Sequence, residues 1–236
     1  CSILLQSVPF ANAQPPNPGD YIVPEYAGDV LSRIAPSGAR TPLFSFAAAT
    51  GPGGVAVDSA GNYIVAESSA HVISRISVAG ARTVVYDYTA SGPLGARPVS
   101  LAIGTAGNYI VAEYTKNVIS RITPGGVRTV VYDYTASGLL GGPVGIAVDS
   151  AGNYVVAEFV GHVISKISVT GTRDVVYDYA PALAQPNGVA IDSAGNYIVA
   201  ESGANKISRI NPATHTWTPI YDYTATGIAG VPVGVA

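Results

Sequence analysis

Apolar and polar residues follow one another in short runs, and these runs come in a fixed order along the chain. In one copy the first run spans residues 54–58, and a turn of small residues at 59–62 follows it. The second, third and fourth runs span residues 63–67, 72–76 and 82–88. β-branched and aromatic residues dominate these runs, and no segment has the 3.6-residue period of a helix. Each copy therefore predicts four short strands joined by tight turns.

The copies recur over almost the whole chain. The glutamate that closes the second run returns every 42 to 46 residues. Four strands in about 44 residues is the size of one propeller blade. A single sheet of this size can bury its two faces only against neighbouring sheets. We therefore expect an all-β fold, a β-propeller of four-stranded blades, with five repeats in residues 19–236.

The ends of the repeat region are out of phase with a whole blade. Residues 19–23 begin a unit at its second run, and residues 232–236 repeat only the first run. Two arrangements are open. Either the chain is a fragment of a propeller with six or more blades, or the two ends pair in one blade and close a five-bladed ring.

The composition excludes several classes of protein. Gly (27), Pro (17) and Tyr (15) are abundant, and only 11% of the residues are charged. The net charge is -3 and there is no basic run, so we expect no nucleic-acid partner. No apolar stretch reaches the roughly 20 residues that span a bilayer. Cys1 is the one cysteine, so no disulfide can form within the chain.

The first residues have the pattern of a processed export signal. Residues 1–5 are largely apolar, and Ala11-Asn12-Ala13 before Gln14 is typical of a signal-peptidase site. We interpret residues 1–13 as the remnant of a secretory signal peptide and 14–18 as a linker. In the competing interpretation Cys1 is a lipidated N-terminus. Both place the protein outside the cytoplasm, secreted or periplasmic.

Most charged residues occupy columns of the repeat. One interpretation is that these columns form ion pairs within or between blades, since every blade needs them. The other is a ring of carboxylates that binds Ca²⁺ or Mg²⁺ or a basic ligand, and no other cofactor is expected. The glutamate column is Glu25, Glu67, Glu113, Glu158 and Glu201; the basic columns are Arg33, Arg75, Arg121, Lys166 and Arg209, and Arg40, Arg82, Arg128 and Arg173.

A polar slot follows each glutamate by four residues. His71 and His162 occupy it in two units, and Asp29, Asn117 and Asn205 occupy it in the others. All five side chains can hydrogen-bond a nearby backbone group, which favours a loop-bridging role. The alternative is that the two histidines line a functional rim. No spacing of His or Cys typical of zinc occurs.

A ligand site is expected where the blades depart from the repeat. The slot after the glutamate is aromatic in three units, at Tyr26, Tyr114 and Phe159, and aromatic residues dominate binding hot spots. The other departures are Arg97, Ser100, Gly104, Lys116 and Trp217. The candidate ligand-binding residues on this loop face are thus Glu25, Glu67, Glu113, Glu158, Glu201, Tyr26, Tyr114, Phe159, His71 and His162.

The units resemble a known group of propellers. Gly145-Ile146-Ala147-Val148-Asp149-Ser150-Ala151-Gly152-Asn153-Tyr154 and the following Val163-Ile164-Ser165-Lys166-Ile167 are similar to NHL repeats and to the streptogramin-lyase and SMP-30-like propellers. The resemblance implies the fold, but such propellers include binding platforms, lyases, lactonases and amidating enzymes. Streptogramin lyases of this fold are expected to use a histidine near the entry of an inner strand. The matching pairs, such as Gly53-Gly54 and Val144-Gly145, hold none.

The leading hypothesis is therefore a secreted or periplasmic scaffold that binds a protein, peptide or carbohydrate on the loop face carrying the glutamate column. The first alternative is a metal-dependent lyase or lactonase. The second is a structural cell-surface repeat protein. An enzyme needs a non-repeating cluster of acid, base or metal ligands near the central channel, whereas a platform needs a varied outer face.

Overall fold

The computed structural model describes residues 17, 19–91, 95–180, 182, 184–225 and 231–235. The expected signal-peptide remnant at 1–13 lies outside these residues, as does the linker at 14–18 apart from Asn17. Cys1 and its alternative role are therefore outside the described part as well. Among the described residues no helix is both long and apolar enough to cross a membrane.

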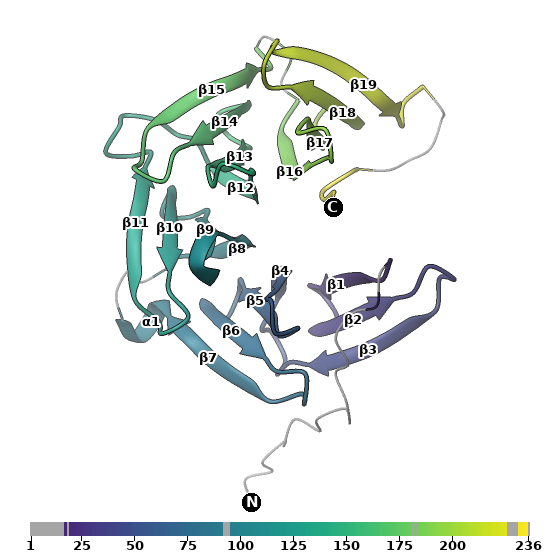
Figure 1. Ribbon diagram of the computed structural model, residues 1–236, viewed down its shortest axis with the longest axis vertical. Coiled ribbons are helices and arrows are strands. Elements are labelled where there is room, and N and C mark those ends of the chain that lie inside the picture. Colours follow the sequence, from purple (N-terminus) through teal and green to yellow (C-terminus); the bar gives the residue numbers. More distant parts are fainter. Residues whose placement is uncertain are drawn as a thin grey trace, which may run out of the picture.

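Five antiparallel sheets stand around a central axis, as Figure 1 shows, and we number them blades 1 to 5 along the chain. This confirms the predicted all-β propeller with five repeats.

Helical turns in the described part are confined to α1 (Tyr88–Ser91) and the 3-10 turn Thr105–Gly107. Blade 1 holds β1 (Tyr21–Glu25), β2 (Val30–Ile34) and β3 (Arg40–Ser45); blade 2 holds β4 (Pro52–Val57), β5 (Tyr63–Glu67), β6 (Val72–Ile76) and β7 (Arg82–Asp87); blade 3 holds β8 (Pro98–Ile103), β9 (Tyr109–Glu113), β10 (Val118–Ile122) and β11 (Arg128–Asp133); blade 4 holds β12 (Pro143–Val148), β13 (Tyr154–Glu158), β14 (Val163–Ile167) and β15 (Arg173–Asp178); blade 5 holds β16 (Pro186–Ile191), β17 (Tyr197–Glu201), β18 (Lys206–Asn211) and β19 (Thr216–Asp222).

The turn between the first two strands of a blade is held by an aspartate. In blade 2 Oδ1 of Asp58 accepts hydrogen bonds from the amides of Ala60 (2.9 Å) and Asn62 (2.8 Å). Gly61 has φ 81° in this turn, a conformation that glycine adopts without steric cost. Blades 4 and 5 repeat the arrangement. In blade 3 Gly104 replaces the aspartate, and the 3-10 turn takes its place.

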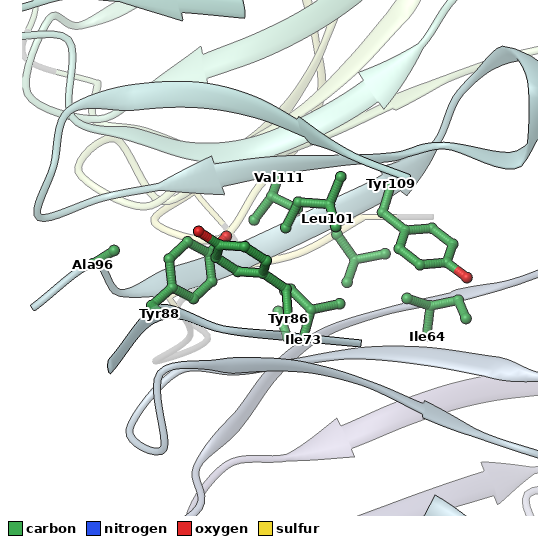
Figure 2. Packing of buried hydrophobic residues seen from close by; sticks show 10 residues of the cluster. Ile64, Ile73, Tyr86, Tyr88, Ala96, Leu101, Tyr109 and Val111 are labelled. Atoms are coloured by element: carbon green, nitrogen blue, oxygen red, sulfur yellow. The ribbon is translucent and has the colours of Figure 1, made fainter. Parts of the chain in front are cut away.

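Most of the hydrophobic core lies between neighbouring blades. Figure 2 shows one such layer, in which Ile64, Ile73 and Tyr88 of blade 2 face Leu101 and Tyr109 of blade 3. Ile64, Ile73 and Tyr88 are completely buried. Because one sheet cannot bury such residues alone, the stacking of blades supplies the stability of each repeat.

The innermost strands approach one another closely because a glycine column runs through them. A Cβ atom on Gly145 would lie 2.4 Å from the carbonyl oxygen of Asn187 in the next blade. A Cβ atom on Gly188 would lie 2.7 Å from Cα of Gly234, so residues 231–235 lie along β16 as β16 lies along β12. Among the described strands β1 pairs with β2 alone, so the described residues 232–235 do not complete blade 1.

Candidate functional site

A cavity of about 540 Å³ lies at the centre of the ring. The inner strands of blades 2 to 5 and the segment 231–235 form its wall, mainly with glycine backbone and aliphatic side chains. Three larger side chains reach the same cavity: Arg97, Tyr114 and Phe159. All three precede an inner strand or follow a second strand, so they lie where the chain enters the inner strands. Ligand cavities commonly combine apolar walls with a few polar groups in this way.

Arg97 is anchored through its backbone. Its amide donates to Oγ1 of Thr115 at 2.9 Å, and its carbonyl accepts from the amide of Tyr114 at 3.0 Å. Its side chain is half-buried. Within the described part of the chain no carboxylate oxygen lies within ion-pairing distance of its guanidinium. Arg97 is therefore a cation of the cavity wall without an acidic partner in the described residues.

Tyr26 lies beside this group without lining the cavity. Its hydroxyl is 2.9 Å from Oγ of Ser69, and its ring covers Gly51, where a Cβ atom would be 2.9 Å from Cε2. The hydrogen bond with Ser69 lowers the pKa of Tyr26; burial opposes this shift, and the positive charge of Arg97 adds to it. The structure thus gathers the three predicted aromatic residues near one entrance, with Tyr114 and Phe159 on the cavity and Tyr26 beside Arg97.

The five glutamates lie inside their own blades, away from the cavity wall. Glu67, Glu113, Glu158 and Glu201 are at most 1% exposed. In blades 2 to 5 a serine of the third strand donates to each carboxylate, and blade 5 uses Nε1 of Trp217 at 2.7 Å where the other blades use arginine. The arginine contacts are Arg40 with Glu25 (2.6 and 2.8 Å), and Arg82 with Glu67, Arg128 with Glu113 and Arg173 with Glu158 (all 2.7 Å).

These networks also cross the blade boundary. Tyr134 of blade 3 donates to Oε1 of Glu158 in blade 4 at 3.0 Å, and the guanidinium of Arg173 lies 5.7 Å from the centre of its ring. The guanidinium of Arg128 likewise lies 5.8 Å from the centre of the Tyr88 ring. Burial raises the pKa of both tyrosines, and the neighbouring glutamate charge raises it further. This arrangement matches the ion-pair interpretation of the charged columns, and a ligand-binding role for these glutamates stays a prediction.

In blades 1 to 3 the slot residue four positions after the glutamate bridges to the loop that enters the next blade. Nδ1 of His71 is 2.7 Å from the carbonyl oxygen of Ala96, and Oδ1 of Asn117 accepts from the amide of Gly142 at 2.9 Å. All five slot residues have φ between 49° and 58°. Asn, Asp and His are enriched in this left-handed region, which explains the residue types. For His71 the geometry is that of a loop bridge. His162 lies in the equivalent position, but its Nδ1 atom is buried without a hydrogen-bond partner among the described residues.

The described residues do not fit a metal ion. No group of three His, Cys, Asp or Glu side chains among them is placed to hold one. The glutamate carboxylates that we considered for Ca²⁺ or Mg²⁺ already accept hydrogen bonds from arginine, serine or tryptophan.

The remaining departures from the repeat lie at different places. Ser100 lines the cavity, Lys116 is exposed beside Tyr114, and Gly104 lies at the opposite end of β8. The sequence shows Arg97 as a departure from the repeat but does not predict it as a ligand-binding residue. The signal that could have predicted this role is its position directly before Pro98, at the entry of an inner strand, where neighbouring units have glycine.

Comparison with known proteins identifies the group. A model of the Virginiamycin B lyase family matches residues 14–236. This chain belongs to that family. The predicted resemblance to the streptogramin-lyase group is thereby confirmed. No curated protein sequence matches this chain.

Solved structures share the fold of this Virginiamycin B lyase family propeller. One is a catalytically inactive histidine-to-alanine variant of virginiamycin B lyase from Staphylococcus aureus with quinupristin: TM-score 0.73, 22% identity, 90% of this chain and 68% of that chain. A streptogramin B lyase has a TM-score of 0.71 and 23% identity, over 85% of this chain and 64% of that chain. A gluconolactonase from Xanthomonas campestris has a TM-score of 0.73 and 14% identity, over 92% and 75%. The chain thus spans about two thirds of the lyases' length.

Proposed function

We propose that this chain acts as a lyase or lactonase on a cyclic ester that enters the central cavity from the side of Arg97, Tyr114 and Phe159. The observation that carries the proposal is the cavity of about 540 Å³, whose larger lining residues depart from the repeat. A residue repeated in every blade serves the scaffold, whereas a group present in one blade is free to serve a ligand. Membership of the family and the fold shared with lyases and gluconolactonase support this class of reaction over a pure scaffold.

The described residues supply recognition in this proposal. Arg97 donates hydrogen bonds to an oxygen of the ligand, and Tyr114 and Phe159 provide apolar surface at the entrance. The glutamate columns, the bridging slot and the interblade tyrosines keep these groups in place. That the protein is secreted or periplasmic stays a prediction, as do a protein, peptide or carbohydrate partner and a scaffold role without chemistry.

Mass spectrometry of the ligand distinguishes the two reactions. The full chain is incubated with quinupristin and, separately, with gluconolactone. Elimination breaks a C–O bond and removes a proton from the neighbouring carbon, so the opened product keeps the mass of the substrate. Hydrolysis adds one water. Ring-opened quinupristin of unchanged mass, with a new double bond, supports a lyase, and a lactone that gains water supports a lactonase.

A matched pair of variants ties the reaction to the cavity. Arg97→Gln removes the cation of the cavity wall, and Arg121→Gln removes an arginine of the repeated basic column. The proposal expects loss of turnover, by about tenfold or more, in Arg97→Gln alone. If the wild-type chain leaves both ligands unchanged, the enzyme proposal is rejected. Binding of quinupristin without turnover would then favour the scaffold.

A further inference from the structure

The entry loop of blade 3 differs from those of its neighbours in the residue before the first proline. Blades 2, 4 and 5 have Gly51, Gly142 and Gln185 there, each with a left-handed φ of 50° to 58°. In blade 3 the left-handed residue is Gly95 (φ 78°), two positions earlier. Arg97 is free of that constraint and its long side chain lies on the cavity wall. The entry loop of blade 3 therefore has a different backbone conformation, which places one cation on the cavity wall.

Thr115 holds this loop in place. Its hydroxyl accepts from the amide of Arg97 at 2.9 Å and donates to the carbonyl oxygen of Gly95. Tyr114, which precedes it, donates its amide to the carbonyl of Arg97 at 3.0 Å. The backbone of Arg97 is therefore tied at both its polar atoms, and its position relative to Tyr114 is set before a ligand arrives.

The cation has no acidic partner on the cavity wall. The wall around it consists mainly of glycine backbone, which offers peptide groups, and of aliphatic side chains, and Arg97 has no carboxylate partner among the described residues. A half-buried guanidinium gains most from an oxygen that carries negative charge, because the attraction between opposite charges adds to the hydrogen bond. The same wall carries Tyr114 and Phe159, whose rings offer flat apolar surface to a planar group.

We propose that this entrance binds an aromatic acyl group, with a carbonyl or carboxylate oxygen on the guanidinium of Arg97 and the aromatic ring against Tyr114 and Phe159. This inference rests on the proposed function and names the part of the ester substrate that the entrance holds. The two aromatic rings and the single cation of this entrance fit a group that joins a flat ring to an oxygen. A phosphate gains most from a second cation, and Lys116 is not part of the cavity wall.

Small probes test the inference without turnover. Ligand-observed NMR titrations of the full chain with benzoate, benzamide, benzyl alcohol and acetate separate the contribution of the acyl oxygen from that of the ring. We expect benzoate to bind most tightly, benzamide next, and benzyl alcohol and acetate each about tenfold more weakly than benzoate. Arg97→Gln should remove the preference for benzoate over benzyl alcohol. Phe159→Ser, which introduces the serine that blades 2 and 5 carry there, should weaken benzoate more than acetate.

Arg121→Gln serves as the control for net charge and should leave all four affinities unchanged. The inference is overturned if acetate binds as well as benzoate, or if Arg97→Gln leaves the order of affinities intact. Its failure is distinct from failure of the enzyme proposal. A chain that binds benzoate through Arg97 but leaves quinupristin and gluconolactone intact rejects the enzyme and retains the acyl site. A chain that turns over either ester but shows no preference for benzoate supports the enzyme and rejects the acyl site.

Discussion

Tyr134 of blade 3 donates a hydrogen bond of 3.0 Å to Glu158 of blade 4, which is itself bound by Arg173. The tyrosine thus joins the ion pair of the following blade to the face of its own blade. At the boundary between blades 1 and 2, Phe46 holds the corresponding place without a hydroxyl. One buried polar contact therefore contributes to the packing between blades 3 and 4. The hydroxyl group that makes this contact can be removed while the aromatic ring of the side chain is kept.

Tyr134→Phe should destabilise the fold by about 1.5–3 kcal/mol, the usual range for a hydrogen bond to a charged group. The phenylalanine ring fills the same space as the tyrosine ring, so the loss of stability reports on the hydroxyl group alone. Chemical denaturation measures the change in the free energy of unfolding. Tyr21→Phe is the control, because Tyr21 is 61% exposed and its substitution should cost less than about 0.5 kcal/mol. Equal losses in the two variants would contradict the role of the Tyr134 contact.

Arg173→Met should be more damaging than Tyr134→Phe. It leaves the buried carboxylate of Glu158 without its charged partner, at a cost of about 3–5 kcal/mol. The same change in blade 1, Arg40→Met, removes a pair whose side chains are 46% and 31% exposed, and should cost much less, because solvent screens an exposed pair. Chemical denaturation of the two variants measures the loss in free energy of unfolding for the same Arg–Glu pair, buried in blade 4 and exposed in blade 1. A larger loss for Arg40→Met would refute the ranking by burial.

The glycine column of the inner strands offers a steric test. Gly145→Ala places a Cβ atom 2.4 Å from a backbone oxygen of β16, where no side chain can move aside, and should cost about 1–3 kcal/mol. Gly234→Ala meets no described atom within 4 Å and should be neutral within about 0.5 kcal/mol. Thermal unfolding of both variants measures the difference. A neutral Gly145→Ala would mean that the inner strands are farther apart than described.

Alkaline titration followed by tyrosine absorbance tests the group around Arg97. The pKa of Tyr26 is lowered, mainly by Ser69 and further by Arg97, whereas burial raises the pKa of Tyr88 and Tyr134. As the pH rises, Tyr26 should therefore ionise before these buried tyrosines, which ionise only above the ordinary range. Tyr26→Phe should remove the early phase, and Arg97→Gln should move it to higher pH. An early phase that survives Tyr26→Phe would show that another tyrosine causes it.

The sequence predicts the blades well because the repeat is regular. The runs ending at Glu67 and beginning at Val72 are strands in every unit, since each copy must meet identical neighbours. The contact of Arg82 with Glu67 was one of two interpretations, because a separation of 15 residues becomes a contact only through the register of three strands. The contact of Tyr134 with Glu158 was beyond reach, since it depends on how two sheets pack.

The cavity was the hardest feature to predict. In the sequence Arg97, Tyr114 and Phe159 all depart from the repeat, but the residue type predicts ligand binding only for the two aromatic residues. Their common wall is formed by inner strands from four blades together with residues 231–235. Such a surface follows from the curvature of the ring, which the pattern of one unit does not contain. The regular repeat therefore predicts the fold of each blade but does not predict the cavity that the blades form together.

A structure of this chain in complex with quinupristin tests the central claim most directly, namely that the site lies at the non-repeating entrance of the cavity. We expect ligand atoms within about 4 Å of Arg97 and of Tyr114 or Phe159, the usual range of side-chain contacts. We also expect the ion pair of Arg128 with Glu113 to remain intact beneath the ligand. A ligand bound at the opposite face, near Arg75 and Arg121, or one that separates Arg128 from Glu113, would contradict this claim.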